Sequence, residues 1–193
     1  LSFDNATSPT ANNFYGVGFG NNTFVGDGES GNIVRSTDNG TTWDNATTPT
    51  ANDLAGIGFG NNTFVGVGSS GNIVRSTDNG SSFDNVTSPT SNTLRGVTFG
   101  NNTFVGVGEN GNIIRSTDNG SSFDNATSPT TAVNLHGVTF GNNTFVAVGV
   151  DGNMVRSTDN GSSFDNVTSP TANNLYGVTF GNNTFVLSGA DGN

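Results

Sequence analysis

The feature that most constrains this chain is an eight-residue segment that returns four times at nearly fixed intervals. It reads STDNGTTW at residues 36–43 and STDNGSSF at 76–83, 116–123 and 157–164. Successive copies therefore lie about 40 residues apart, a spacing typical of solenoids and propellers. The chain is accordingly expected to be a tandem array of one structural unit.

Each repeat contains four short segments rich in Val, Ile, Phe and Thr, which are separated by Gly, Asn, Asp or Pro. In the third copy these are GVTFG at 96–100, TFVGVG at 103–108, NIIRS at 112–116 and SSFDN at 121–125. Such segments predict β-strands joined by tight turns. Four strands in a repeat of about 40 residues are typical of one β-propeller blade.

The repeated octet has the composition of a turn between the third and fourth of these strands. In the third copy, Asp118 can accept hydrogen bonds from amides of the turn, and Gly120 permits a left-handed backbone. Phe123 then returns an aromatic ring to the packing face. The copies are expected to agree because every blade needs the same corner.

The pattern Ser-x-Asp-x-Gly-x-x-aromatic resembles the Asp box of sialidases and many other β-propellers, with Phe in place of the usual Trp in three copies. The half-repeat GVTFGNNTFVGVG is similar to bacterial Asp-box repeats related to photosystem II assembly-factor propellers. This resemblance implies a propeller fold and carries no catalytic residues across. The box residues, for which it implies a structural role, are Ser36, Asp38, Gly40 and Trp43; Ser76, Asp78, Gly80 and Phe83; Ser116, Asp118, Gly120 and Phe123; and Ser157, Asp159, Gly161 and Phe164.

We therefore expect an all-β chain, with residues 1–193 forming a single β-propeller domain of five tandem Asp-box repeats. The third-strand segment occurs four times, whereas the other three segments occur five times, so one blade is expected to lack a strand. A ring closed by pairing the N-terminal strand, at residues 1–5, with the last two strands is the preferred arrangement. A slice of a longer array is an alternative. In another, the incomplete blade recruits a strand from a second molecule, because unpaired strand edges attract partners.

Charge and cysteine content exclude several functions. Fifteen acidic residues against five basic ones give a formal net charge of -10, and this field repels nucleic acids and anionic membranes. The absence of cysteine excludes disulfides and cysteine-based metal sites. Because His136 is the sole histidine and no segment has calcium-loop spacing, we expect neither a metal nor a cofactor.

Differences between the copies gather at one end of the predicted blades, where the second-to-third and fourth-to-first connections lie. Rigid scaffolds often carry binding residues on such loops, although drift of tolerant loops explains the differences at least as well. Aromatic, cationic and carboxylate side chains around one mouth would suit a sugar or a peptide. The candidate ligand-binding residues are Tyr15, Glu29, Arg95, Glu109, His136, Asp151, Tyr176 and Asp191.

These residues do not predict an enzyme. A glycosidase pair of carboxylates is formally possible, but solvated loop tips explain the acidic residues better. The abundant serines belong to turns, which argues against a Ser-His-Asp set. Four arginines precede the boxes at one equivalent position, so the repeat spreads them apart. We expect Arg35, Arg75, Arg115 and Arg156 to pair with Asp44, Asp84, Asp124 and Asp165.

The leading hypothesis is a non-catalytic binding module for a glycan or an extracellular protein, located outside the cell or at its surface. Recurring Asn-x-Ser/Thr sequons would suit a secreted protein, although duplication of an Asn- and Thr-rich unit explains them slightly better. The alternative is a structural, self-assembling or engineered repeat scaffold without a small ligand.

Overall fold

The computed structural model describes residues 5–192 as a series of antiparallel β-sheets, which we call blades 1 to 5. Strands follow one another in sequence order within each sheet. The strands are β1 (Phe14–Gly20), β2 (Thr23–Gly28), β3 (Ile33–Ser36) and β4 (Asp44–Asn45) in blade 1; β5 (Leu54–Gly60), β6 (Thr63–Gly68), β7 (Ile73–Ser76) and β8 (Asp84–Val86) in blade 2; β9 (Leu94–Gly100), β10 (Thr103–Gly108), β11 (Ile113–Ser116) and β12 (Asp124–Asn125) in blade 3; β13 (Leu135–Gly141), β14 (Thr144–Gly149), β15 (Met154–Ser157) and β16 (Asp165–Val167) in blade 4; and β17 (Leu175–Gly181) and β18 (Thr184–Gly189) in blade 5.

The connection after the second strand of each blade is a single 3₁₀ turn. These turns are η1 (Glu29–Gly31), η2 (Ser69–Gly71), η3 (Glu109–Gly111), η4 (Val150–Gly152) and η5 (Ala190–Gly192). In the part of the chain that the structure describes, no helix combines the length and apolar character needed to cross a bilayer.

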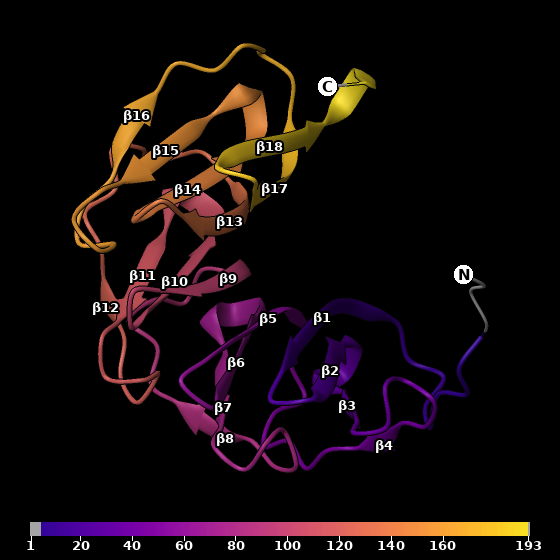
Figure 1. Cartoon of the computed structure of the whole chain (residues 1–193). Coiled ribbons are helices and arrows are strands. Elements are labelled where there is room, and N and C mark those ends of the chain that lie inside the picture. Colours follow the sequence, from indigo (N-terminus) through magenta and orange to yellow (C-terminus); the bar gives the residue numbers. More distant parts are fainter. Residues whose placement is uncertain (1–4, 193) are drawn as a thin grey trace.

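The blades stand side by side in an arc, with the first strand of each blade on its concave side and the fourth strand of blades 1 to 4 on its outer side (Figure 1). This arrangement confirms the all-β propeller class and the five blades of the predicted array. The arc is open, however, and the expected ring is not formed (Figure 1). Phe19 on β1 and Val186 on β18 stay largely exposed, whereas ring closure would bury the two end faces. Of the strand expected at residues 1–5, residues 1–4 lie outside the described part of the chain, and Asn5 is not in a strand.

The hairpin between the first two strands of each blade turns on two asparagines. In blade 3, Asn101 and Asn102 have positive φ values of 47° and 59°, as the tight turn predicted from GNNT requires. Asparagine tolerates this left-handed backbone better than most residues, because its short side chain can bond locally. The hairpin therefore forms from sequence-local interactions.

The hydrophobic core is divided into layers between neighbouring blades. Between blades 1 and 2, Val25 and Ile33 pack with Leu54, Phe64 and Phe83. Equivalent layers lie between blades 2 and 3 and between blades 3 and 4. Each blade therefore buries its apolar side chains against the next blade, and the array is stabilised by a succession of similar interfaces.

One buried carboxylate interrupts this pattern. Asp27 is fully buried on β2, at a position occupied by Val67 in blade 2 and Val107 in blade 3. Neither of its carboxylate oxygens has a hydrogen-bond partner among the described residues. Desolvation by burial raises the pKa of Asp27 to about 7, against the lowering effect of nearby backbone groups, because the charged form is poorly solvated there.

The Asp box is a closed hydrogen-bonded turn. In blade 2 the Ser76 hydroxyl donates to Asp78 Oδ1 at 2.8 Å and accepts from the Gly80 amide at 2.9 Å. The Ser82 amide and hydroxyl donate to the two Asp78 oxygens at 3.0 and 2.6 Å. Gly80 has a φ of 77°, which favours glycine. The turn places Phe83 in the interblade core.

The arginines before the boxes do not pair as predicted. Arg35 lies directly across the strand pair from Asp44, yet its Nε donates to the Asn79 carbonyl of the next blade at 2.9 Å. Arg75 and Arg115 repeat this bond to later boxes at 2.8 Å, while Arg156, which has no later box in the described residues, is exposed. The predicted ion pairs are wrong, because the aspartates point into solvent and a fixed carbonyl of the neighbouring blade lies within reach.

Candidate functional site

The first strands of the five blades bring their opening residues to one mouth of the array. Tyr15, Ala55, Arg95, His136 and Tyr176 occupy equivalent positions and line a single open pocket of about 580 Å³. The rest of the lining comes from the adjoining connections and consists of Asp53, Ser69, Thr93 and Glu109. We call this pocket the mouth site.

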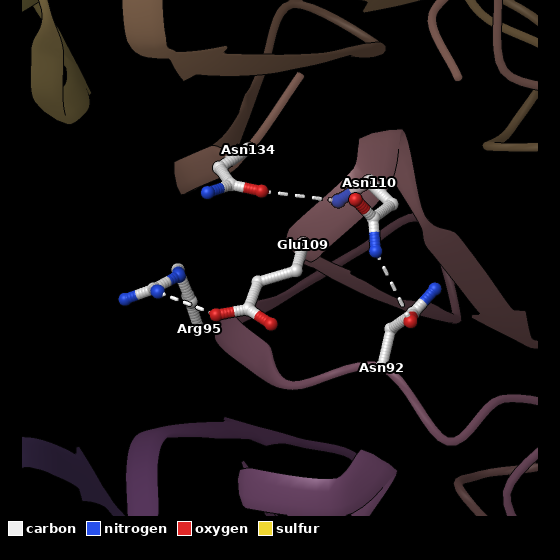
Figure 2. Close-up of polar contacts among 5 residues, drawn as sticks. All are labelled: Asn92, Arg95, Glu109, Asn110 and Asn134. Atoms are coloured by element: carbon white, nitrogen blue, oxygen red, sulfur yellow. Dashed lines mark hydrogen bonds and ion pairs between the residues drawn. The ribbon is translucent and has the colours of Figure 1, made fainter. Parts of the chain in front are cut away.

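The lining of the mouth site includes an ion pair. Arg95 Nη2 donates to Glu109 Oε1 at 2.6 Å, and about a third of each side chain is exposed. Figure 2 shows the two side chains facing each other, Arg95 from the start of β9 and Glu109 from η3 of the same blade. It is the one salt bridge found within residues 5–192. Because both groups are partly solvated, the pair contributes orientation more than stability.

Aromatic rings line the wall beside this pair. The His136 and Tyr176 rings lie 5.5 Å apart between centroids with a tilt of 56°, a favourable aromatic geometry. Desolvation, together with the positive charge of Arg95, lowers the pKa of His136 below its ordinary value. The imidazole is therefore neutral at pH 7, with one nitrogen able to donate and the other able to accept. Tyr15 and Tyr176 are each 54% exposed and offer further aromatic surface.

Hydrogen bonds between blades fix the rim of the mouth. The amide of Asn110 donates to Asn134 Oδ1 of the next blade at 3.1 Å, and Asn110 Nδ2 donates to Asn92 Oδ1 at 3.3 Å (Figure 2). The equivalent amide of Ser30 donates to Asp53 Oδ1 at 2.7 Å. The amide of Asp151 likewise donates to Asn174 Oδ1 at 2.9 Å, so η1, η3 and η4 are each tied to the connection entering the following blade. These bonds fix three of the turns that form the rim.

Five of the eight predicted ligand residues meet in the mouth site, and three lie outside its lining. Glu29 accepts hydrogen bonds from the amide and side chain of Asn13 at 3.3 Å. Asp151 and Asp191 have φ values of 53° and 55° at the centre of their turns. The central residue of this turn is Ser, Asn or Asp in every repeat, because these residues tolerate a positive φ. The variation between repeats that suggested ligand residues at this position is therefore explained by the turn itself.

Sequence comparison between the repeats did not select Asp53 or Thr93 as ligand residues. Each lies one position before the first strand of its blade, in a connection that varies between the repeats. Their position just before Leu54 and Leu94 was the available signal, because residues entering the inner strands converge on the mouth. Within the described residues, His, Cys, Asp and Glu side chains form no group of three or more that could hold a metal ion.

The family model described as Photosynthesis system II assembly factor YCF48 matches residues 28–193. YCF48 from Cyanidioschyzon merolae superimposes with a TM-score of 0.73 at 16% identity, over 97% of this chain and 67% of that chain. A structure of YCF48 bound to D1 peptide gives a TM-score of 0.72 at 17% identity, over 95% and 65%. This chain therefore spans about two thirds of the length of these structures, and their likeness shows the fold. No curated protein matches it significantly.

These findings overturn two expectations drawn from the sequence. The hypothesis of a glycan- or extracellular-protein-binding module is wrong, as is an extracellular or cell-surface location, because the matching family consists of photosystem II assembly factors. The alternative of a self-assembling or engineered scaffold gains no clear support from them either. The GVTFGNNTFVGVG resemblance is confirmed, since the family model covers most of the repeats, and the chain belongs to the family of Photosynthesis system II assembly factor YCF48.

Proposed function

We propose that this chain is a non-catalytic assembly factor that binds an extended peptide of a photosystem II subunit in the mouth site. The observation that carries the proposal is the convergence of Tyr15, Arg95, His136 and Tyr176 on one open pocket. Membership of the YCF48 family, and the D1 peptide bound in the structure of one YCF48 neighbour, indicate the class of partner. The chain would then act where photosystem II is assembled.

The chemistry of the pocket suits a peptide. An extended peptide presents backbone amides and carbonyls together with side chains, so its site needs apolar surface and a few directed polar groups. The Tyr15 and Tyr176 rings supply surface that a bound chain would cover. The neutral His136 ring and the exposed parts of Arg95 and Glu109 supply donors and acceptors.

The frame around the pocket favours binding without rearrangement. Bonds from Ser30 to Asp53 and from Asn110 to Asn134 tie the rim across blade boundaries. A preformed rim loses little conformational entropy when a peptide binds, so more of the contact energy appears as affinity. The 3₁₀ turns and the inner strands therefore act together as a scaffold for the mouth site.

The test is a titration of the chain with fluorescently labelled, overlapping peptides that span the D1 protein, followed by fluorescence anisotropy. We expect one stretch of peptide to saturate. Arg95→Ala and Tyr176→Ala should each weaken it by about 10-fold or more, since a lost charged hydrogen bond or a buried aromatic is worth about 1.4 kcal/mol or more.

Arg156→Ala is the control for Arg95→Ala, because Arg156 is an exposed arginine that lies outside the mouth site. The control should bind like the natural chain. The proposal fails if no D1 peptide saturates, or if Arg156→Ala weakens binding as much as Arg95→Ala.

A further inference from the structure

The contact between blades 1 and 2, which we call the seam, has hydrogen bonds at both ends and an unpartnered carboxylate between them. At the mouth end, the Ser30 amide donates to Asp53 Oδ1 at 2.7 Å. At the opposite end, Asn79 Nδ2 donates to Thr23 Oγ1 at 2.6 Å. Asp27 lies between these bonds on β2, fully buried, and neither of its carboxylate oxygens has a hydrogen-bond partner among the described residues. The seam is therefore fixed at its ends and carries a poorly solvated group inside.

The carboxylate of Asp27 fills a slot between the inner strands of the two blades. Asp27 pairs with Gly16 of β1. A Cβ atom on Gly16 would collide with Asp27 Oδ1 and would lie 3.2 Å from the Cα atom of Gly56 on β5. Strands of blades 1 and 2 form both walls of this slot. The carboxylate is therefore buried by the contact between two described blades and not at an outer face of the array.

The slot lies directly beside the mouth site. Tyr15 and Ala55 line the mouth, and they immediately precede the two glycines of the slot, Gly16 and Gly56. Ala55 has the smallest side chain among the five equivalent mouth residues, so blade 2 contributes little more than backbone to the wall here. Because adjacent Cα atoms are held about 3.8 Å apart, a separation of β1 from β5 at the slot also moves Tyr15 away from Ala55. The width of the mouth thus depends on the seam.

No charged side chain on the surrounding elements neutralises Asp27. It packs against β1, β3 and β5, and the turn η1 follows it in the chain. β5 carries no ionisable side chain, and Arg35 of β3 donates to the carbonyl of Asn79 at the end of the seam away from the mouth. The other ionisable residues on or beside these elements are Tyr15, Glu29 and Asp53. Tyr15 lines the mouth, and the two carboxylates accept hydrogen bonds from neighbouring amides.

An ionised carboxylate in this slot is unfavourable, because it has lost water and gained no partner. Burial therefore raises the pKa of Asp27 to about 7, although backbone groups of Asp27 and Gly56 act to lower it. The protonated form fits the closed seam, whereas the ionised form favours a seam that is open enough to admit water. Because the folded pKa lies above its ordinary value, the closed seam is favoured at low pH and opposed as pH rises through 7.

We propose that Asp27 is a positioning residue of the mouth site, and that loss of its proton loosens the seam and weakens peptide binding. The binding step of this inference rests on the proposed function. The carboxyl O–H bond breaks and its proton passes to water, and no other covalent bond changes. Tyr15 then moves away from Ala55, and the preformed shape of the mouth is lost. A peptide must restore that shape in order to bind, so its affinity falls.

The first test is an anisotropy titration from about pH 6 to about pH 9 with a D1 peptide that has capped termini and no His or Cys. The affinity of the natural chain should be constant below pH 7 and fall by up to about 10-fold per pH unit above it, since one proton is released. His136 does not interfere, because its lowered pKa keeps it neutral over most of this range.

Asp27→Asn has nearly the same shape and cannot ionise, so its affinity should match that of the natural chain near pH 6 and then stay constant. Asp27→Val, with the residue that blades 2 and 3 have, repeats the test if Asp27→Asn misfolds by circular dichroism. Glu29→Gln is the matched control, because it removes a carboxylate from the adjoining turn but outside the mouth lining. It should keep the natural pH profile.

The second test needs no peptide. Amide hydrogen exchange in β5, corrected for the intrinsic effect of pH on the exchange rate, should become faster above pH 7 in the natural chain but not in Asp27→Asn. β13 is the internal reference, because it lies away from the seam, and its corrected rate should not change. A peptide affinity that does not vary with pH, or equal protection of β5 on both sides of pH 7, overturns the inference. If no D1 peptide saturates, the proposed function fails instead, and the exchange of β5 still decides whether the seam opens.

Discussion

Asn79 and Thr23 are 56 positions apart in the chain and are joined by a side-chain hydrogen bond of 2.6 Å. The backbone carbonyl of the same asparagine accepts from Arg35 at 2.9 Å. Asn79 therefore adopts the left-handed backbone that its own turn requires, with a φ of 62°, and also forms two hydrogen bonds to the preceding blade. This double use explains why the box keeps Asn next to its glycine in every copy.

The first prediction concerns this bond between blades. Asn119→Gly keeps the left-handed backbone and removes the donor to Thr63. We expect the free energy of unfolding to fall by about 1 kcal/mol more than an Asn-to-Gly replacement costs without the lost bond. Asn39→Gly is the control, because Asn39 has the same backbone conformation without the interblade bond. Urea unfolding of both variants measures the difference. Equal losses in the two variants would show that the bond contributes nothing.

The second prediction concerns pH. Burial raises the pKa of Asp27 from 3.8 to about 7, so the folded chain holds this proton more tightly than the unfolded chain. The contribution of this group to the free energy of unfolding is therefore most favourable below about pH 4 and falls as pH rises towards 7. Asp27→Val should increase the free energy of unfolding most near pH 8. Near pH 4 the part of this increase that depends on pH should be small. The change restores the apolar residue found in blades 2 and 3.

Urea unfolding at several pH values checks this prediction, with Ser188→Val as the control at the corresponding position of β18. Ser188→Val removes no ionisable group. The difference in free energy of unfolding between this control and the natural chain should therefore not vary with pH in this range. If the difference in free energy of unfolding between Asp27→Val and the natural chain stays constant from pH 4 to 8, the pKa of Asp27 is not raised.

The third prediction concerns the box carboxylate. Burial acts to raise the pKa of Asp118, but hydrogen bonds from the hydroxyl and amide of Ser122 and the hydroxyl of Ser116 outweigh it and lower the pKa to about 2. Ser122→Ala removes the 2.6 Å bond from the Ser122 hydroxyl, so the pKa of Asp118 should rise towards its ordinary value. Carboxyl NMR during an acid titration measures it. Ser121→Ala is the control, because the turn uses the backbone amide of Ser121 and not its hydroxyl. This variant should leave the pKa of Asp118 unchanged.

The same depressed pKa sets the direction of the acid response. Because the folded pKa lies below the unfolded one, the stabilisation from Asp118 is present above about pH 4 and disappears as pH falls through 2. Ser122→Ala should therefore show a smaller loss of stability over this interval than the natural chain. An unchanged acid transition would contradict the assignment.

The fourth prediction concerns the glycines under the aromatic rings. Gly100→Ala forces a methyl group against the Phe140 ring, and overpacking of this kind costs about 1–3 kcal/mol. Gly181→Ala introduces the same methyl group where nothing lies within 4 Å, so the isolated chain should tolerate it. Thermal unfolding in dilute solution compares the two. Similar stability of both variants would show that the interblade contact is loose.

Local patterns in the sequence predicted much of the fold. The segment around Asn101 and Asn102 formed the expected hairpin, and the β11 strand lies within the predicted NIIRS segment. The mouth was predicted only in part. Tyr15, Arg95, His136 and Tyr176 were found because they share one repeat position, whereas Asp53 and Thr93 carried no comparable signal.

The sequence by itself determined the turns and strands, because each depends on a few adjacent residues whose backbone preferences and side-chain bonds act locally. Tertiary structure alone decided how blade meets blade. It directed Arg35 to Asn79 rather than to Asp44, buried Asp27, and left Phe19 and Gly181 uncovered at opposite ends of an open arc. These outcomes depend on the relative placement of sheets formed by residues about 40 positions apart in sequence, which no local pattern encodes.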